Sequence, residues 1–228
     1  MRDVSLSLGA SAPDQSVRFS LPAFEVEAGE AVALTGPSGC GKSTLLNLLA
    51  GLRRVDSGEV RVAGRDLGNL SVAELDRHRG KHLGMVFQSF HLLAPFTAVE
   101  NVEIGLRFGV RQFPRRQRRD RALKVLRRVG LGERLQARPG EMSVGERQRV
   151  AIARAIAGAP SLLLADEPTG SLDPETGREI FALLREVAAE ENRTLLMVTH
   201  DPELAAALPR VFDCSGLIGT RPETETAP

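Results

Sequence analysis

The sequence contains no tyrosine and no tryptophan, and it has only two cysteines among 228 residues. Cys40 and Cys214 are too few for the disulfide framework of a small secreted protein, which favours a reducing compartment. No apolar run approaches the roughly 18 residues of a membrane span, and the first residues lack the basic-then-apolar order of an export signal. We therefore expect a chain that is neither secreted nor integral to a membrane.

An excess of charge is also lacking. Thirty Lys and Arg residues face 29 Asp and Glu residues, which leaves a net charge of +1 and gives no argument for a nucleic-acid partner. The chain is 42% hydrophobic and 26% charged, as is ordinary for a soluble globular protein. A chain of this length buries enough apolar surface to fold without disulfide bonds or structural metals.

Short apolar runs at residues 32–35, 162–165 and 195–198 each end in a polar or glycine-rich turn. Strands that are apolar at every position are typical of a parallel sheet with both faces buried. Between the last two runs, Ile180, Leu183, Leu184 and Val187 repeat with helical spacing. This alternation predicts an α/β fold with a mainly parallel sheet.

Other segments follow different patterns. Residues 4–8 and 18–27 are typical of antiparallel strands, and residues 89–157 are mostly helical in pattern. We expect one domain over residues 1–228, with an α/β core at 1–88 and 158–215. The predicted helical subdomain at 89–157 is inserted in that core, and residues 216–228 form a loose tail.

One segment matches the phosphate-binding pattern G-x-x-x-x-G-K-[ST]. It consists of Gly36, Pro37, Ser38, Gly39, Cys40, Gly41, Lys42, Ser43 and Thr44. Glycines let successive backbone N–H groups surround a phosphate, and the positive end of the following helix favours the same anion. Lys42 adds a full positive charge, and the Ser43 hydroxyl can ligate Mg²⁺. The fold class is therefore specified further as a P-loop NTPase core.

Asp166 and Glu167 follow the apolar run at 162–165. An acidic pair after a strand is usually only a solvated strand end. Together with a phosphate loop, it favours a hydrolytic site in which one carboxylate holds Mg²⁺ and its neighbour polarises a water. The carboxyl ends of strands are where open α/β sheets bind ligands.

Four further segments make the chain resemble the ATP-binding cassette (ABC) ATPases. Residues 142–155 (MSVGERQRVAIARA) are similar to the signature helix of that family, and Gln88 in VFQSF is similar to its glutamine loop. Residues 171–173 (SLD) resemble its D-loop, and residues 199–201 (THD) resemble its switch histidine. The motifs occur in the family's order and cover about residues 4–215.

The resemblance implies an ATPase that uses ATP and Mg²⁺. Residues 36–44 would bind the ATP phosphates, while Ser43, Gln88 and Asp166 would organise Mg²⁺ and its waters. Glu167 would act as the general base, and His200 would contact the γ-phosphate.

The resemblance also implies a dimer, with a homodimer favoured. Ser143 and Gly145, beside Glu146 in the signature segment, would reach the nucleotide of a second copy, and Asp173 would link the two sites. Read without the family, Ser143 and Glu146 form an S-x-x-E capping box that starts a helix. That helix would aim its positive end at the shared anion.

Within the family, residues 87–93, 97–102 and 165–173 most resemble the lipoprotein-release, macrolide-export and cell-division branch. This implies a separate membrane permease as partner, no nucleic acid, and a peripheral location on the cytoplasmic face of the inner membrane. Four apolar residues would line the groove for a short permease helix, or would equally be core: Phe90, Leu92, Leu93 and Phe96. The alternatives are a mechanical envelope or division ATPase that moves no solute, and a weakly active cassette.

Two features depart from the family pattern. Val144 stands where the family has glycine, and a positive φ at this position would strain its backbone by about 1–3 kcal/mol. The family also stacks adenine on an aromatic residue after the first strand, but residues 9–17 contain none. Phe19 is the nearest aromatic residue, and we favour a core position for it over a role in base stacking. We expect weak discrimination between nucleotide bases.

Two smaller signals remain. Residues 111–128 carry nine basic residues and one acid, Asp120, which is typical of a solvated helix face. Contact with anionic lipid headgroups and binding of nucleic acid are the sharper alternatives. Cys40 occupies a variable position of the phosphate loop, where the helix end can lower a thiol pKa, so we expect thiol reagents to inhibit and ATP to protect.

Overall fold

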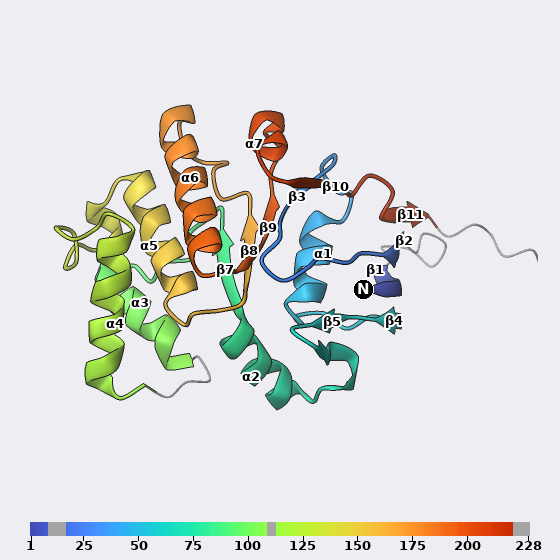
Figure 1. Ribbon diagram of the computed structural model, residues 1–228, viewed down its shortest axis with the longest axis horizontal. Helices are drawn as coiled ribbons and strands as arrows, with labels where there is room; N and C mark the ends of the chain where they lie inside the picture. The colour runs from blue at the N-terminus through green and yellow to red at the C-terminus, as the bar shows by residue number, and fades with distance from the viewer. Residues whose placement is uncertain (9–16, 109–112, 221–228) are drawn as a thin grey trace, which may run out of the picture. The chain divides into compact units, whose positions relative to one another are not determined.

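The computed structural model describes residues 1–8, 17–108 and 113–220 (Figure 1). The chain divides into two compact units. Unit 1 comprises Met1–Glu25, Thr35–Leu70 and Asp213–Pro228, and unit 2 comprises Val26–Leu34 and Ser71–Phe212. The division into an α/β core and a helical subdomain at residues 88 and 158 stays a prediction.

Unit 1 is built on an antiparallel sheet with the strand order β11-β2-β1-β4. Its strands are β1 (Arg2–Leu8), β2 (Val17–Ala23), β4 (Ser57–Glu59) and β11 (Ile218–Thr220). The antiparallel N-terminal pair is therefore confirmed. The prediction of a loose tail at 216–228 is wrong for residues 218–220, because β11 pairs with β2. The remaining elements of unit 1 are helix α1 (Lys42–Leu49), hairpin strands β5 (Arg61–Val62) and β6 (Arg65–Asp66), and the 3-10 turn η1 (Leu67–Asn69).

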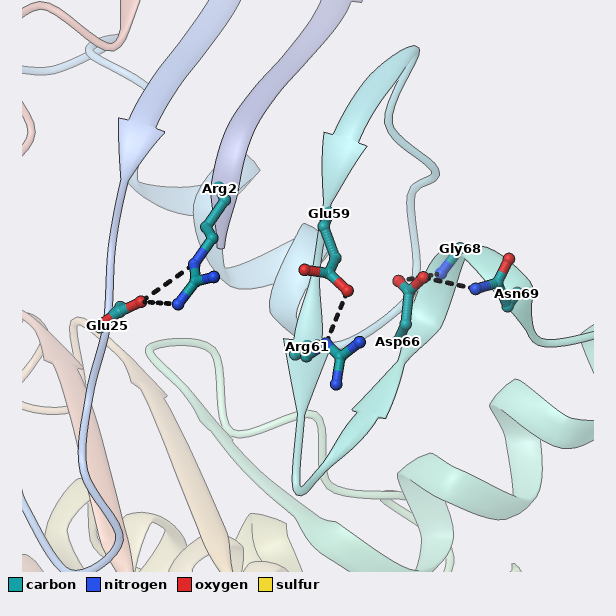
Figure 2. A network of polar contacts seen from close by, with 7 residues as sticks. All are labelled: Arg2, Glu25, Glu59, Arg61, Asp66, Gly68 and Asn69. Atoms are coloured by element: carbon teal, nitrogen blue, oxygen red, sulfur yellow. Dashed lines mark hydrogen bonds and ion pairs between the residues drawn. The ribbon is translucent and has the colours of Figure 1, made fainter.

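The interior of unit 1 contains alternate residues of β2 together with leucines of α1. Phe19 and Leu21 are almost completely buried, as are Leu45 and Leu48. At the surface, exposed polar groups join neighbouring segments (Figure 2). Arg2 donates to Glu25, Arg61 donates to Glu59, and Asp66 accepts from the Gly68 amide and the Asn69 side chain. Exposed pairs of this kind contribute little stability, so burial dominates in this unit.

Unit 2 contains the sheet with strand order β10-β3-β9-β8-β7. The strands are β3 (Ala31–Thr35), β7 (Leu83–Phe87), β8 (Leu162–Asp166), β9 (Thr194–Val198) and β10 (Arg210–Asp213). The pairs β3/β9, β9/β8 and β8/β7 are parallel. All three strands expected from apolar runs are present, and their interior residues are buried on both faces.

The helices of unit 2 account for the remaining apolar patterns. They are α2 (Val72–His82), α3 (Ala98–Phe108), α4 (Arg115–Arg128), α5 (Val144–Ile156), α6 (Pro174–Glu190) and α7 (Pro202–Ala206), with a 3-10 turn η2 (Pro139–Glu141). Helices α3, α4 and α5 pack on one another (Figure 1). Ile180, Leu184 and Val187 of α6 are buried, as their spacing predicts. No helix in the described part of the chain combines the length and apolar character that a bilayer crossing requires.

Candidate active site

The phosphate loop of unit 1 has the backbone that its glycines allow. Gly36, Gly39 and Gly41 have φ values of 133°, 80° and 106°, in the region that favours glycine. A Cβ atom on Gly36 would lie 2.8 Å from the Cys40 Sγ atom, so this position also lacks room for a side chain. The loop therefore depends on glycine for both conformation and space.

Lys42 and the start of α1 give the loop its positive character. The buried Lys42 ammonium donates to the carbonyl oxygens of Gly36 at 2.7 Å and Pro37 at 2.9 Å. The N-cap residue of α1 is Gly41, which has no side chain to cap the helix, and the first turn has no acidic residue, so this helix end suits an anion. Ser43 is exposed in that turn. Lys42 and the N–H groups of α1 suit the phosphates of ATP, and the Ser43 hydroxyl suits a ligand of Mg²⁺.

Both cysteines belong to unit 1 and both are buried. The Lys42 Nζ atom lies 3.8 Å from Cys40 Sγ. Burial, and then the neighbouring Cys40, raise the pKa of Cys214 to about 12. Cys214 therefore stays protonated in neutral solution.

In unit 2, the register of the parallel strands aligns three chain segments at the carboxyl ends of β7, β8 and β9. Asp166 lies opposite Phe87 on one side and Val198 on the other. Gln88, Glu167 and residues 199–200 follow these strand ends directly. The sheet thus brings together side chains that are 32 to 112 residues apart in the sequence.

Glu167 and His200, two of the predicted site residues, form a close pair at this end of the sheet. The His200 Nε2 atom lies 2.6 Å from Glu167 Oε1, within hydrogen-bond distance. Glu167 has a φ of 47°, a conformation that costs a non-glycine residue about 1–3 kcal/mol and is concentrated at functional sites. Both side chains line a cavity of about 290 Å³, together with Asp173 and Thr199. This arrangement suits a carboxylate that polarises a water.

Gln88 and Asp173 are held by the segment that follows Glu167. The Ser171 hydroxyl donates to the backbone carbonyl oxygen of Gln88 at 3.3 Å. A Cβ atom on Gly170 would lie 2.9 Å from Nε2 of the Gln88 side chain. Asp173 accepts from the Thr176 amide at the start of α6, and this bond lowers the pKa of its carboxyl group. The expected D-loop aspartate therefore also caps a helix.

The signature segment has the expected capping box. Ser143 accepts from the Glu146 amide, and Glu146 accepts from the Ser143 amide, which lowers the pKa of Glu146. A Cβ atom on Gly145 would lie 2.7 Å from Thr176 Cγ2, so this glycine allows α6 to pack closely. Val144 is the first residue of α5 and has no positive φ, so the strain considered for it is absent.

Sequence reasoning missed several buried polar residues. Gln148 is fully buried on α5, and its amide donates to the Pro168 carbonyl oxygen at 2.7 Å, next to Glu167. Its only sequence signal is a polar residue within an apolar helical face. Of the residues considered for base stacking, 9–16 lie outside the described residues and Phe19 is buried in the core.

The comparisons with known proteins agree with this geometry. The ABC transporter family model matches residues 21–170. A lipoprotein-releasing system ATP-binding protein LolD from Chromohalobacter salexigens is 50% identical over 189 residues, which cover 83% of this chain and 79% of that protein. The macrolide export ATP-binding/permease protein MacB of Rhodopirellula baltica is 48% identical over 188 residues, which cover 82% of this chain but 28% of that longer protein.

A solved structure extends the comparison to the fold. The dimeric post-hydrolysis state of the ATP-binding cassette MJ0796, bound to ADP and Pi, superimposes with a TM-score of 0.81 at 36% identity. The match covers 93% of this chain and 92% of that one. The P-loop fold class and the family resemblance expected from the sequence are thereby confirmed, and the chain belongs to the ABC transporter family.

Proposed function

We propose that this chain is the ATP-hydrolysing subunit of an ABC transport system and that it dimerises around two ATP molecules to drive a separate membrane permease. Its cofactors are ATP and Mg²⁺, in keeping with its family. The observation that carries the proposal is the contact between Glu167 and His200 at the carboxyl ends of the parallel strands. The names of its relatives favour a role in lipoprotein release or macrolide export.

Each half of the reaction has its own residues. In unit 1, the glycine-lined loop and Lys42 bind the phosphates. In unit 2, Glu167 accepts a proton from the attacking water, and His200 contacts the γ-phosphate while holding the Glu167 carboxylate in place. Ser43 of unit 1 and Gln88 and Asp166 of unit 2 are the residues that would hold Mg²⁺, and the ion would supply positive charge for the phosphates.

The start of α5 supplies the dimer contact. Ser143 and Gly145 lie at the positive end of a 13-residue helix, which suits the γ-phosphate of a nucleotide held by a second copy. Val144 is 37% exposed beside them, so this end of α5 is open to a partner. Asp173 lies at the start of the neighbouring α6 and would carry the signal between the two sites.

The location we propose is the cytoplasmic face of the inner membrane, reached through the permease. Helix α4 supports this placement. Its Arg118, Arg121 and Arg128 bond to groups of the chain itself. Its other basic residues are exposed: Arg115, Arg116, Arg119, Lys124 and Arg127. Such a surface is attracted to anionic headgroups beside a permease.

The test compares ATP turnover and dimerisation of the wild type with Glu167→Gln and Lys42→Ala. We expect Glu167→Gln to lower kcat about 100-fold or more while an ATP-bound dimer accumulates, because water activation fails but phosphate binding persists. Lys42→Ala should lose Mg-ATP binding. Light scattering after gel filtration in Mg-ATP measures the dimer.

The matched control is Glu203→Gln, since Glu203 is an exposed carboxylate that lines the same cavity. Its turnover should stay within about twofold of the wild type, because Glu203 lies on α7 and does not directly follow a strand of the sheet, as Glu167 does. Unchanged turnover in Glu167→Gln would remove Glu167 from the base role. An ATP-bound Glu167→Gln monomer would contradict the dimer.

A further inference from the structure

One turn of unit 2 has a backbone that the proposed chemistry does not explain. Phe90 and His91 follow Gln88 by two and three residues, and their φ values are 59° and 47°. Two consecutive non-glycine residues in the left-handed region are strained, and such strain persists only where surrounding contacts enforce it. The contacts that enforce it come from α5.

Arg154, near the end of α5, donates to both carbonyl oxygens of this turn. Its Nη1 atom lies 2.5 Å from the His91 oxygen, and its Nη2 atom lies 2.7 Å from the Phe90 oxygen. The planar guanidinium allows both bonds at once, which a lysine ammonium on one flexible stem does poorly. Burial lowers the pKa of Arg154, and the carbonyl oxygens compensate for its lost hydration.

A second arginine of α5 contacts the same turn. The Arg147 guanidinium lies 5.4 Å from the centre of the Phe90 ring, within range of a cation–π interaction. Arg147 and Arg154 are seven residues apart, so they project from one face of the helix. The stem of Arg154 packs at Gly105 of α3, where a Cβ atom would lie 2.8 Å from Arg154 Cγ. The guanidinium position is thus set by α3 as well as by the turn.

We propose that Arg154 is a positioning residue that makes the Gln88 loop and the signature helix move as one body. Helix α5 begins beside Ser143 and spans about 20 Å, and a helix of this length is stiff. A displacement of Gln88 would therefore reach Ser143 through the Arg154 bonds. The inference rests on the proposed function, because it assigns Gln88 to one nucleotide and Ser143 to the other.

The test uses Arg154→Lys, with Arg149→Lys as the matched control. Arg149 is on the same helix and also donates to a backbone carbonyl, that of Val129 at 3.1 Å, but it does not contact the Gln88 loop. For Arg154→Lys we expect kcat to fall about tenfold or more, because charged hydrogen bonds to the turn are lost. The KM for ATP should stay within about threefold, because Arg154 does not belong to the phosphate loop. Arg149→Lys should keep the wild-type kcat.

A second measurement does not depend on ATP turnover. Hydrogen exchange at the Phe90 and His91 amides, followed by mass spectrometry without nucleotide, should speed up about tenfold in Arg154→Lys and not in Arg149→Lys. ATP-induced dimerisation of Glu167→Gln should weaken when Arg154→Lys is added.

Three results would overturn the inference: an unchanged kcat, an equal loss in both lysine variants, or unchanged amide exchange in an active enzyme. A wild type that hydrolyses no more ATP than Lys42→Ala would instead refute the proposed function, and the amide exchange would still decide whether Arg154 holds the turn.

Discussion

Glu167 illustrates how much of this site depends on single residues. Its backbone conformation is unfavourable for an L-amino acid, yet its amide donates to the Val198 carbonyl oxygen and its carbonyl oxygen accepts from Gly170. These two bonds and the His200 contact fix the carboxylate where β8 ends. Preorganisation of this kind would keep the proposed base oriented before substrate binds.

At the same scale, the two cysteines should differ in reactivity. Cys214 is fully buried with a pKa of about 12, so its reactive thiolate is negligible at pH 8. Cys40 is 7% exposed in the phosphate loop beside Lys42. We expect a small thiol reagent to label Cys40 first and to inhibit ATP hydrolysis, with ATP slowing the labelling.

Mass spectrometry of peptides after brief labelling gives the site, and Cys214→Ser is the control that should label as the wild type does. Labelling of Cys214 before Cys40, or full activity after Cys40 is modified, would contradict this prediction.

At the scale of elements, α5 combines a local start with distant contacts. Its capping box uses residues three apart, so it is recognisable in the sequence alone. Gln148, Arg147 and Arg154 instead contact segments 20 to 64 residues away. Sequence reasoning therefore predicted where α5 begins but not which loops it holds.

The capping box should give α5 a pH-dependent stability. The Ser143 amide, and then Arg134, lower the pKa of Glu146 in the folded state. A lowered folded pKa means that this contribution is fully present above the ordinary glutamate value and is lost as the pH falls through the folded value. Glu146→Gln should reduce the free energy of unfolding by about 0.5–1 kcal/mol at pH 7 and by a smaller amount near pH 3.

Urea unfolding at the two pH values measures the difference. Glu133→Gln, at an exposed glutamate in the same region, should have little effect at either pH. A cost for Glu146→Gln that is as large at pH 3 as at pH 7 would show that the charge is not the cause.

At the scale of the whole molecule, the residues of the proposed reaction are divided between the two units. Unit 1 has the phosphate loop and unit 2 has Asp166, Glu167 and His200. Loading with Mg-ATP should therefore stabilise the chain, because a ligand that binds only the folded state adds about 2.7 kcal/mol at 100 times its Kd. For a chain of this size we expect Tm to rise by roughly 5–10 °C.

Thermal unfolding with and without Mg-ATP checks this shift. Lys42→Ala should abolish it, chelation of Mg²⁺ should reduce it, and Lys124→Ala, at an exposed lysine of α4, should leave it intact. An equal Tm rise in Lys42→Ala would place nucleotide binding elsewhere.

The sequence by itself determined those features of the fold that depend on residues close together in the chain. The phosphate loop, the apolar strands, the face of α6 and the caps of α5 all follow from patterns a few residues long, because backbone conformation and burial are set locally. Only the tertiary structure decided which distant groups meet. The Glu167–His200 pair, the Arg154 bonds to the Phe90–His91 turn and the packing of Gly145 on α6 join residues 31 to 64 apart. These contacts result from strand register and helix packing, which no short stretch of sequence encodes.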